Sequence, residues 1–157
     1  MQKITPFLWF DNQAEEAITL YTSIFKDSKV LSMSRYPEGA PGLAGSVMTA
    51  SFELHGQQFV ALNGGPQYKF TEAISFVINC DTQEEVDELW AKLSEGGVEQ
   101  QCGWLKDKFG VSWQVVPSEF PRLLQGGDAK KSQKVMQAMM QMKKLDINVL
   151  KKAYEEG

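Results

Sequence analysis

The chain carries few side chains with strong chemical reactivity. Its 157 residues include one histidine, His55, and two cysteines, Cys80 and Cys102. A single histidine in a predicted turn cannot build a Ser-His-Asp or Cys-His catalytic group. Two cysteines are too few for a four-cysteine zinc site or a disulfide scaffold, and their wide separation gives no activating motif. We expect buried, reduced thiols, with a redox pair of strand ends as the alternative.

Neutral polar and aromatic side chains form the second group of interest, on a predicted hairpin from Cys102 to Pro117. The turn Asp107-Lys108-Phe109-Gly110 contains a glycine that tolerates positive φ. Strand side chains alternate between the two faces of a sheet. The second strand therefore has an apolar face and a polar face, formed by Val111, Trp113 and Val115 on one side and Ser112 and Gln114 on the other.

The elements before this hairpin form a repeated pattern. We predict a strand, a helix and three strands in the first half, with the helix capped by Asn12 in a capping box with Glu15. The second half repeats this order, with Thr82 and Glu85 as the capping box, and aligning Tyr21 with Trp90 superimposes the two helices. Helical spacing predicts one buried stripe on each helix, formed by Ala14, Ala17, Ile18, Tyr21 and Phe25 on the first and by Val86, Leu89, Trp90 and Leu93 on the second. The predicted strands are 4–10, 30–36, 46–54, 58–63, 73–80 and 98–101, followed by the hairpin.

Strand alternation then assigns side chains to faces. One helix covers the apolar face of each module, and we expect the two modules to form a continuous curved sheet. Polar groups buried without partners cost ~1–3 kcal/mol each, so polar and aromatic residues on the concave face indicate a ligand or ordered water. The expected concave face contains Thr5, Phe7, Trp9, Phe59, Ala61, Asn63, Ser75, Val77, Asn79, Ser112 and Gln114.

Helices are predicted after Pro117, outside the duplicated core. Asp128 caps a helix with a methionine-rich stripe that includes Met136 and Met139, and Asp146 caps another with Ile147 and Leu150. We expect a lid on the sheet or on a second subunit, with a partner-binding helix as the alternative. The predicted division is 1–66 and 67–118 for the two modules and 119–157 for the helical extension.

Composition limits the function classes. With 43% hydrophobic and 23% charged residues and a net charge of −4, the sequence is typical of a soluble globular protein without a general basic surface. We expect no nucleic-acid partner. Neither an apolar signal core nor a segment of ~20 apolar residues is present, so we expect a cytoplasmic protein without a membrane partner.

Four segments carry a resemblance to a known family: Ile4–Phe10, Ala14–Ala17, Leu62–Gly65 and Asp107–Trp113. They resemble the vicinal-oxygen-chelate superfamily, which includes glyoxalase I and the bleomycin- and fosfomycin-resistance proteins. Within it the sequence is most similar to the PhnB-like branch, labelled 3-demethylubiquinone-9 3-methyltransferase. The resemblance implies an α+β fold of paired βαβββ modules with a concave cup, and assembly as a homodimer.

The resemblance also permits a test for metal binding. Metal-dependent members hold a divalent ion with histidine and glutamate side chains from the outer strands of the two modules. Neutral oxygens are poor ligands for transition metals, so we expect no metal and no cofactor. Carried over position by position, the metal-ligand places fall on Thr5 or Pro6, Asn63 or Ala61, Ser75, and Gln114.

The methyltransferase label implies a glycine-rich loop between a strand and a helix, as is usual for S-adenosylmethionine sites. The glycine pairs Gly64-Gly65, Gly96-Gly97 and Gly126-Gly127 are predicted instead in turns or at helix ends. We interpret the label as a family name.

The leading hypothesis is a metal-independent small-molecule-binding protein with its ligand in the cup. An enzyme of the same superfamily, with lyase, transferase or dioxygenase-like chemistry, is the second hypothesis, and a structural or regulatory dimer without a ligand is the third. Arg35 and Lys106 are candidate anion binders, with solvated surface positions as the alternative. The predicted ligand-binding residues are Thr5, Phe7, Trp9, Asn63, Ser75, Trp104 and Gln114.

Overall fold

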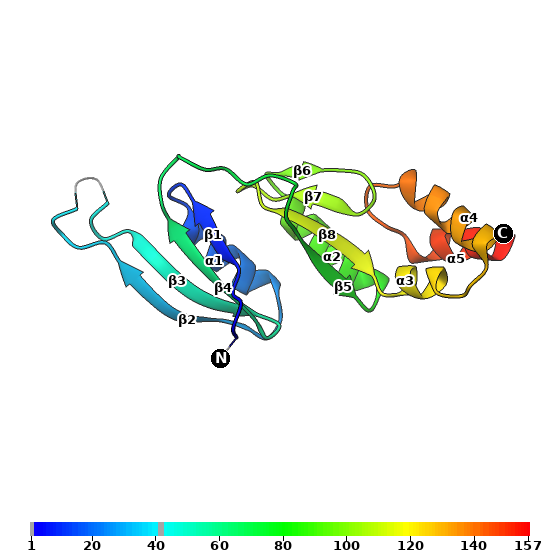
Figure 1. Cartoon of the computed structure of the whole chain (residues 1–157), viewed down its shortest axis with the longest axis horizontal. Helices are drawn as coiled ribbons and strands as arrows, with labels where there is room; N and C mark the ends of the chain where they lie inside the picture. Colours follow the sequence, from blue (N-terminus) through cyan, green and yellow to red (C-terminus); the bar gives the residue numbers. More distant parts are fainter. Residues whose placement is uncertain (1, 41–42) are drawn as a thin grey trace. The chain divides into compact units, whose positions relative to one another are not determined.

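The computed structural model describes residues 2–40 and 43–157, and the chain forms two compact units, Met1–Phe70 and Thr71–Gly157 (Figure 1). The prolines and glycines of residues 37–45 predict a loop, and its positions 41 and 42 lie outside the described residues. Each unit contains its own four-stranded sheet, so the expected single continuous sheet is wrong. Within the described part of the chain, no helix combines the length and apolar character needed to cross a membrane.

The first unit is a βαβββ module. Its elements are β1 (Phe7–Phe10), α1 (Ala14–Ile24), β2 (Ser28–Arg35), β3 (Val47–Leu54) and β4 (Gln57–Asn63). The sheet order is β1-β4-β3-β2, with β1 parallel to β4 and the other pairs antiparallel. The predicted hairpin turn is confirmed, because His55 and Gly56 join β3 to β4 with φ of 48° and 82°.

One face of the first sheet is buried beneath α1. The predicted helix stripe is confirmed, since Ala17, Ile18 and Tyr21 are buried and the Tyr21 ring stacks on Phe52 with centroids 6.4 Å apart. Alternation along the strands places Leu8, Phe10, Phe52, Phe59 and Ala61 in the same core.

The first turn of α1 is capped differently from the sequence prediction. Gln13 occupies the N-cap position and makes no side-chain cap bond, so the predicted Asn12 capping box is wrong. Asn63, at the end of β4, supplies the cap: its Oδ1 accepts the Ala14 N–H at 2.9 Å, while its Nδ2 donates to the Val47 carbonyl at 3.0 Å. Asn63 is 5% exposed, so these two bonds satisfy a buried amide.

The second unit repeats the module and adds three helices. The module consists of β5 (Ser75–Cys80), α2 (Gln83–Ser94), β6 (Val98–Glu99), β7 (Trp104–Lys106) and β8 (Ser112–Pro117). The sheet order is β5-β8-β7-β6, with β5 parallel to β8. The Thr82 cap is confirmed, because its hydroxyl accepts the Glu85 N–H at 3.1 Å. The buried α2 stripe is also as predicted, with Val86, Leu89, Trp90 and Leu93.

A buried carboxylate holds the turn between β7 and β8. Asp107 is 3% exposed, and its Oδ1 accepts the backbone N–H groups of Phe109 at 2.9 Å and Val111 at 3.0 Å. Its Oδ2 accepts the Trp113 indole N–H at 2.9 Å. Gly110 adopts φ of 92°, as the predicted turn requires. This turn fixes the pairing of β7 with β8.

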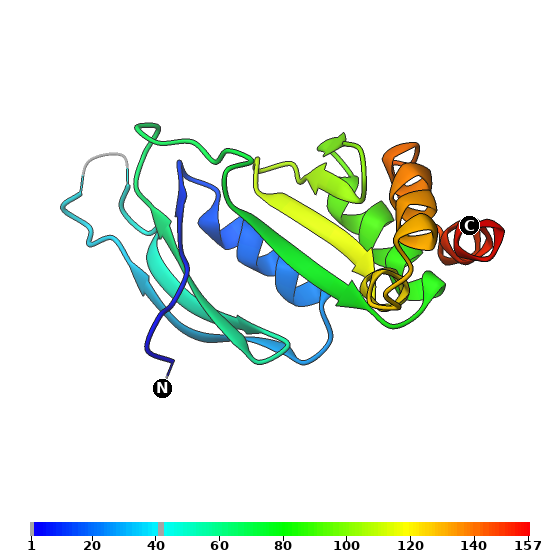
Figure 2. The ribbon, with the colours of Figure 1, turned by 45° about the vertical axis from the view of Figure 1, so that its right-hand side comes forward.

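The C-terminal helices α3 (Glu119–Leu124), α4 (Ala129–Met140) and α5 (Ile147–Glu156) belong to the second compact unit (Figure 2). The predicted caps Asp128 and Asp146 are confirmed. The segment between α4 and α5 is attached to α2 through Gln83, whose Nε2 donates to the Leu145 carbonyl at 3.0 Å and whose Oε1 accepts the Ile147 N–H at 2.8 Å.

The methionine stripe of α4 is split between packed and exposed positions. Val135 is fully buried and Met139 is half-buried, whereas Met136 is 39% exposed. This stripe therefore has a packed component.

The division of the chain into modules at 66/67 and a helical extension at 118/119 stays a prediction.

Substitution of Asn63 tests the corrected cap. We expect Asn63→Ala to lower the free energy of unfolding by about 2–4 kcal/mol, because the Ala14 N–H and the Val47 carbonyl each lose a buried partner. Urea denaturation followed by far-UV circular dichroism measures this loss. The exposed Asn12→Ala is the matched control and should change the value by less than about 0.5 kcal/mol. Equal losses in the two variants would contradict the assignment.

Candidate functional site

The sheet of the second unit has one face packed against α2 and a second face that carries the polar side chains. Leu105, Trp113 and Val115 are buried on the packed face. Because successive strand residues alternate, the neighbours of these three point the other way. We call this second side the open face of the second sheet. Its members are Ser75, Val77 and Asn79 on β5, Trp104 and Lys106 on β7, and Ser112, Gln114 and Val116 on β8.

Three predicted binding residues meet on this open face. The Gln114 Nε2 donates to the Ser75 Oγ at 2.9 Å, which joins β8 to β5. Trp104 is the registered neighbour of Gln114 on β7. Both Trp104 and Gln114 are half-buried. The structure therefore places an indole ring beside a pair of neutral hydrogen-bonding groups.

Two further polar groups lie next to this trio. Ser112 is 1% exposed, and among the described residues its hydroxyl is the buried side-chain polar atom without a hydrogen-bond partner. Lys106 is the registered neighbour of Ser112, and its Nζ lies 2.6 Å from the Glu72 Oε1. The hydrogen bond from Lys106 lowers the pKa of the Glu72 carboxyl. The open face therefore carries one ion pair in addition to its neutral groups.

Sequence reasoning placed Ser112 on the correct strand face but omitted it from the predicted binding residues. Lys106 was considered as an anion binder without being assigned to this site. Strand register is the signal that could have assigned both Ser112 and Lys106 to this site. A hairpin closed by Asp107-Lys108-Phe109-Gly110 pairs the residue before the turn with the second residue after it, Lys106 with Ser112.

The predicted residues of the first unit follow a different pattern. Phe7 and Trp9 lie on the face of the first sheet opposite α1, and Phe7 is 57% exposed. The Trp9 indole N–H donates to the Gly65 carbonyl at 2.9 Å, and a Cβ at Gly64 would overlap the indole ring. The Gly64-Gly65 segment thus fixes the position of the Trp9 ring. Thr5 precedes β1 and is half-buried.

Asn63, Phe59 and Ala61 do not lie on the same face as Trp9. The predicted placement of these three on the concave face is wrong, because β4 turns them towards α1. In the parallel β1–β4 register, Trp9 pairs with Leu62 and Phe10 pairs with Asn63. The Asn63 side chain is used entirely in capping α1 and binding Val47.

The donor set does not fit the metal ion of the metal-dependent superfamily members. None of the positions carried over from them is a carboxylate or an imidazole: they are Thr5 or Pro6, Asn63 or Ala61, Ser75, and Gln114. The Asn63 amide oxygen already accepts the Ala14 N–H. Among residues 2–40 and 43–157, no group of three or more His, Cys, Asp or Glu side chains is arranged to hold a metal. We derive no chemistry through such an ion.

The remaining reactive side chains occupy structural positions. Burial is the main cause that raises the pKa of the Cys80 thiol to about 12, so this cysteine is protonated and unreactive at neutral pH. His55 is exposed in the β3–β4 turn. Arg35 pairs with Glu15 at 2.9 Å, and the hydrogen bond from Arg35 lowers the pKa of the Glu15 carboxyl. Arg35 is therefore engaged with α1.

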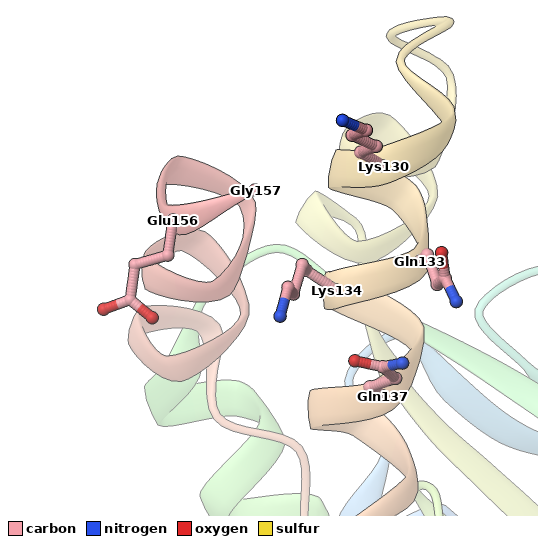
Figure 3. A pocket seen from close by; sticks show the side chains of 6 residues that line it. All are labelled: Lys130, Gln133, Lys134, Gln137, Glu156 and Gly157. Carbon is pink, nitrogen blue, oxygen red and sulfur yellow. The ribbon is translucent and has the colours of Figure 1, made fainter.

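A second candidate location lies between α4 and α5 (Figure 3). It is a hollow of about 230 Å³, and all of its lining side chains are exposed. Lys134 and Gln137 extend from α4 towards α5, whereas the Glu156 carboxylate points away. The open face of the second sheet is the stronger candidate, because it combines an aromatic ring with partly buried polar groups.

A family model described as 3-demethylubiquinone-9 3-methyltransferase matches residues 2–116, a region that ends before α3. Comparison with curated proteins gives no match.

Several solved structures are similar to the chain. A protein from Bacillus cereus, described as a 3-demethylubiquinone-9 3-methyltransferase and PhnB protein, is 41% identical with a TM-score of 0.70, and the match covers 74% of this chain and 99% of that one. Protein PA1353 from Pseudomonas aeruginosa is 24% identical with a TM-score of 0.64, over 74% and 98% of the two chains. A glyoxylase/bleomycin resistance protein/dioxygenase domain from Frankia sp. EAN1pec is 16% identical with a TM-score of 0.48, over 74% and 92%.

Proposed function

We propose, from the premise that this chain belongs to the 3-demethylubiquinone-9 3-methyltransferase family in its PhnB-like branch, that it is a metal-independent small-molecule-binding protein. The predicted resemblance to this branch is confirmed by the family model and the Bacillus cereus structure. The predicted α+β fold of two βαβββ modules with C-terminal helices is also confirmed.

One observation carries the proposal: the hydrogen bond between Gln114 and Ser75 lies next to Trp104 on the open face of the second sheet. An indole ring supplies a flat apolar surface, and the amide and hydroxyl supply directional hydrogen bonds. Such a combination is typical of a pocket that orients a small molecule. Thr5, Phe7 and Trp9 belong to the first unit, where their binding role stays a prediction from the sequence, and Asn63 leaves the proposal.

Binding is favoured over methyl transfer by the connections between strands and helices. A phosphate- or nucleotide-binding loop needs glycines where a strand leads into a helix. Here β1 leads into α1 through Asp11-Asn12-Gln13, and β5 leads into α2 through Asp81-Thr82, without a glycine in either. Gly65, Gly96 and Gly127 all have positive φ, in keeping with the predicted turns and helix ends. We infer that the family description names ancestry rather than the reaction of this chain.

A thermal-shift screen against metabolites and antibiotics tests the proposal. We expect at least one compound to raise the melting temperature, because a ligand at 100-fold its Kd stabilises the folded state by about 2.7 kcal/mol. The shift should persist in EDTA, since the proposed site uses no metal. Gln114→Ala and Trp104→Ala should each reduce the shift by more than half.

Gln57→Ala is the control, because Gln57 is an exposed glutamine at the start of β4 in the first unit. It should leave the shift unchanged. A shift that is insensitive to Gln114→Ala and Trp104→Ala, or that disappears in EDTA, would contradict the proposal.

We also propose that the chain forms a homodimer. The edge strand β2 pairs only with β3 in the described sheet, and its Val30 and Leu31 are 45% and 41% exposed. Exposed edge strands with apolar side chains are normally covered by another surface. A second copy of the chain is the partner that we infer.

Light scattering coupled to size-exclusion chromatography tests this assembly. The expected mass is twice the chain mass of 17.6 kDa. Val30→Glu should shift the protein to a monomer, while Val149→Glu, on an equally exposed valine of α5, should not. A monomer of the unmodified protein at micromolar concentration would contradict the proposal.

A further inference from the structure

We propose that the ligand of the open face carries a carboxylate, which binds the Ser112 hydroxyl and the Lys106 ammonium group. This inference rests on the proposed function and names the chemical class of its ligand. The sequence resemblance assigned no role to Ser112 in ligand binding. Three features of Ser112 support this assignment: its burial, its position in the strand register, and the charge next to it.

The Ser112 hydroxyl is buried and has no hydrogen-bond partner among the described residues. Buried polar groups in folded proteins are nearly always paired, and an unpaired group is costly. A ligand oxygen that accepts its proton would remove this cost on binding. A hydroxyl kept in this condition is therefore suited to an incoming acceptor.

Strand register determines which side chains lie next to Ser112. Ser112 lies on the central strand β8, between Ser75 on β5 and Lys106 on β7 at the directly registered positions. The next row on the same face consists of Val77, Gln114 and Trp104. A molecule whose flat ring contacts Trp104 would therefore place a substituent one row away, next to Ser112 and Lys106.

The positive charge of Lys106 favours a negatively charged substituent on the ligand. Its Nζ lies 2.6 Å from a carboxylate oxygen of Glu72, whose side chain is 51% exposed. The Lys106 side chain is 29% exposed, and an ion pair that stays in contact with solvent contributes little to stability. Glu72 thus shows that a carboxylate fits against Lys106, and a ligand carboxylate can replace it. The registered neighbours of Lys106, Val98 and Ser112, are neutral, so once Glu72 is displaced this lysine matches one negative charge on the ligand.

Calorimetric titration with matched acids and amides tests the inference. The probes are 4-hydroxybenzoate, salicylate and indole-3-acetate, each paired with its primary amide. We expect at least one acid to bind about tenfold more tightly than its amide, the ratio that corresponds to 1.4 kcal/mol. Lys106→Met and Ser112→Ala should each remove most of this preference. The affinity for the amide should stay within about twofold.

A control lysine and the ligand-free protein give independent checks. Lys92→Met removes an ion pair of the same 2.6 Å length with Glu88 on α2 and should leave the acid preference intact. Without ligand, Ser112→Ala should raise the melting temperature, because the unpaired hydroxyl is gone. A lowered melting temperature would show that the hydroxyl is already satisfied in the free protein and would overturn the inference.

The two proposals fail in different ways. Equal binding of acids and amides, an acid preference that survives both variants, or no acid binding at about 10 mM would overturn the carboxylate assignment. The proposed function would still stand if a library compound gave a shift that depends on Gln114 and Trp104. Loss of that dependence would overturn the proposed function instead.

Discussion

The buried Asp107 carboxylate is the interaction on which the second sheet depends. A carboxylate removed from water is costly unless hydrogen-bond donors surround it, and here two backbone N–H groups and the Trp113 indole do so. These donors converge when residues 107–113 form one tight turn. The turn sets β7 against β8 with Lys106 opposite Ser112. A slip of one residue would exchange the two faces of the strand, so Asp107 determines which side chains reach the open face.

A related device operates in the first unit, where the buried Asn63 amide joins the end of β4 to the start of α1 and to β3. In each module, backbone groups satisfy most of the hydrogen bonds of one buried polar side chain. For Asp107 these backbone groups lie a few residues along the chain, and for Asn63 they lie in other elements. The Asp107 and Asn63 side chains thus fix how neighbouring elements lie against one another. These structural bonds do not use Ser112, Gln114 or Trp104, the residues that we propose for ligand binding.

Local signals predicted most of the fold because they depend on residues close in sequence. The Thr82, Asp128 and Asp146 caps, the helix stripes and both glycine turns are of this kind. The Asn12 cap was wrong because a residue from β4, about fifty positions away, supplies the acceptor instead. The parallel β1–β4 register, in which Trp9 pairs with Leu62, places Asn63 on the opposite face from Trp9. Ser75, Trp104 and Gln114 were placed together correctly because simple strand alternation decides their face.

Hydrogen exchange of the backbone amides in the unmodified protein and in Asp107→Ala tests the role of Asp107 most directly. We expect the amides of the β7–β8 hairpin, including Val111, to exchange at least about 100-fold faster in the variant. Loss of the Asp107 hydrogen bonds should lower the free energy of local opening of this hairpin by about 3 kcal/mol. The amides of β3 and β4 in the first unit should keep their protection. Unchanged protection of the hairpin in Asp107→Ala would contradict the account.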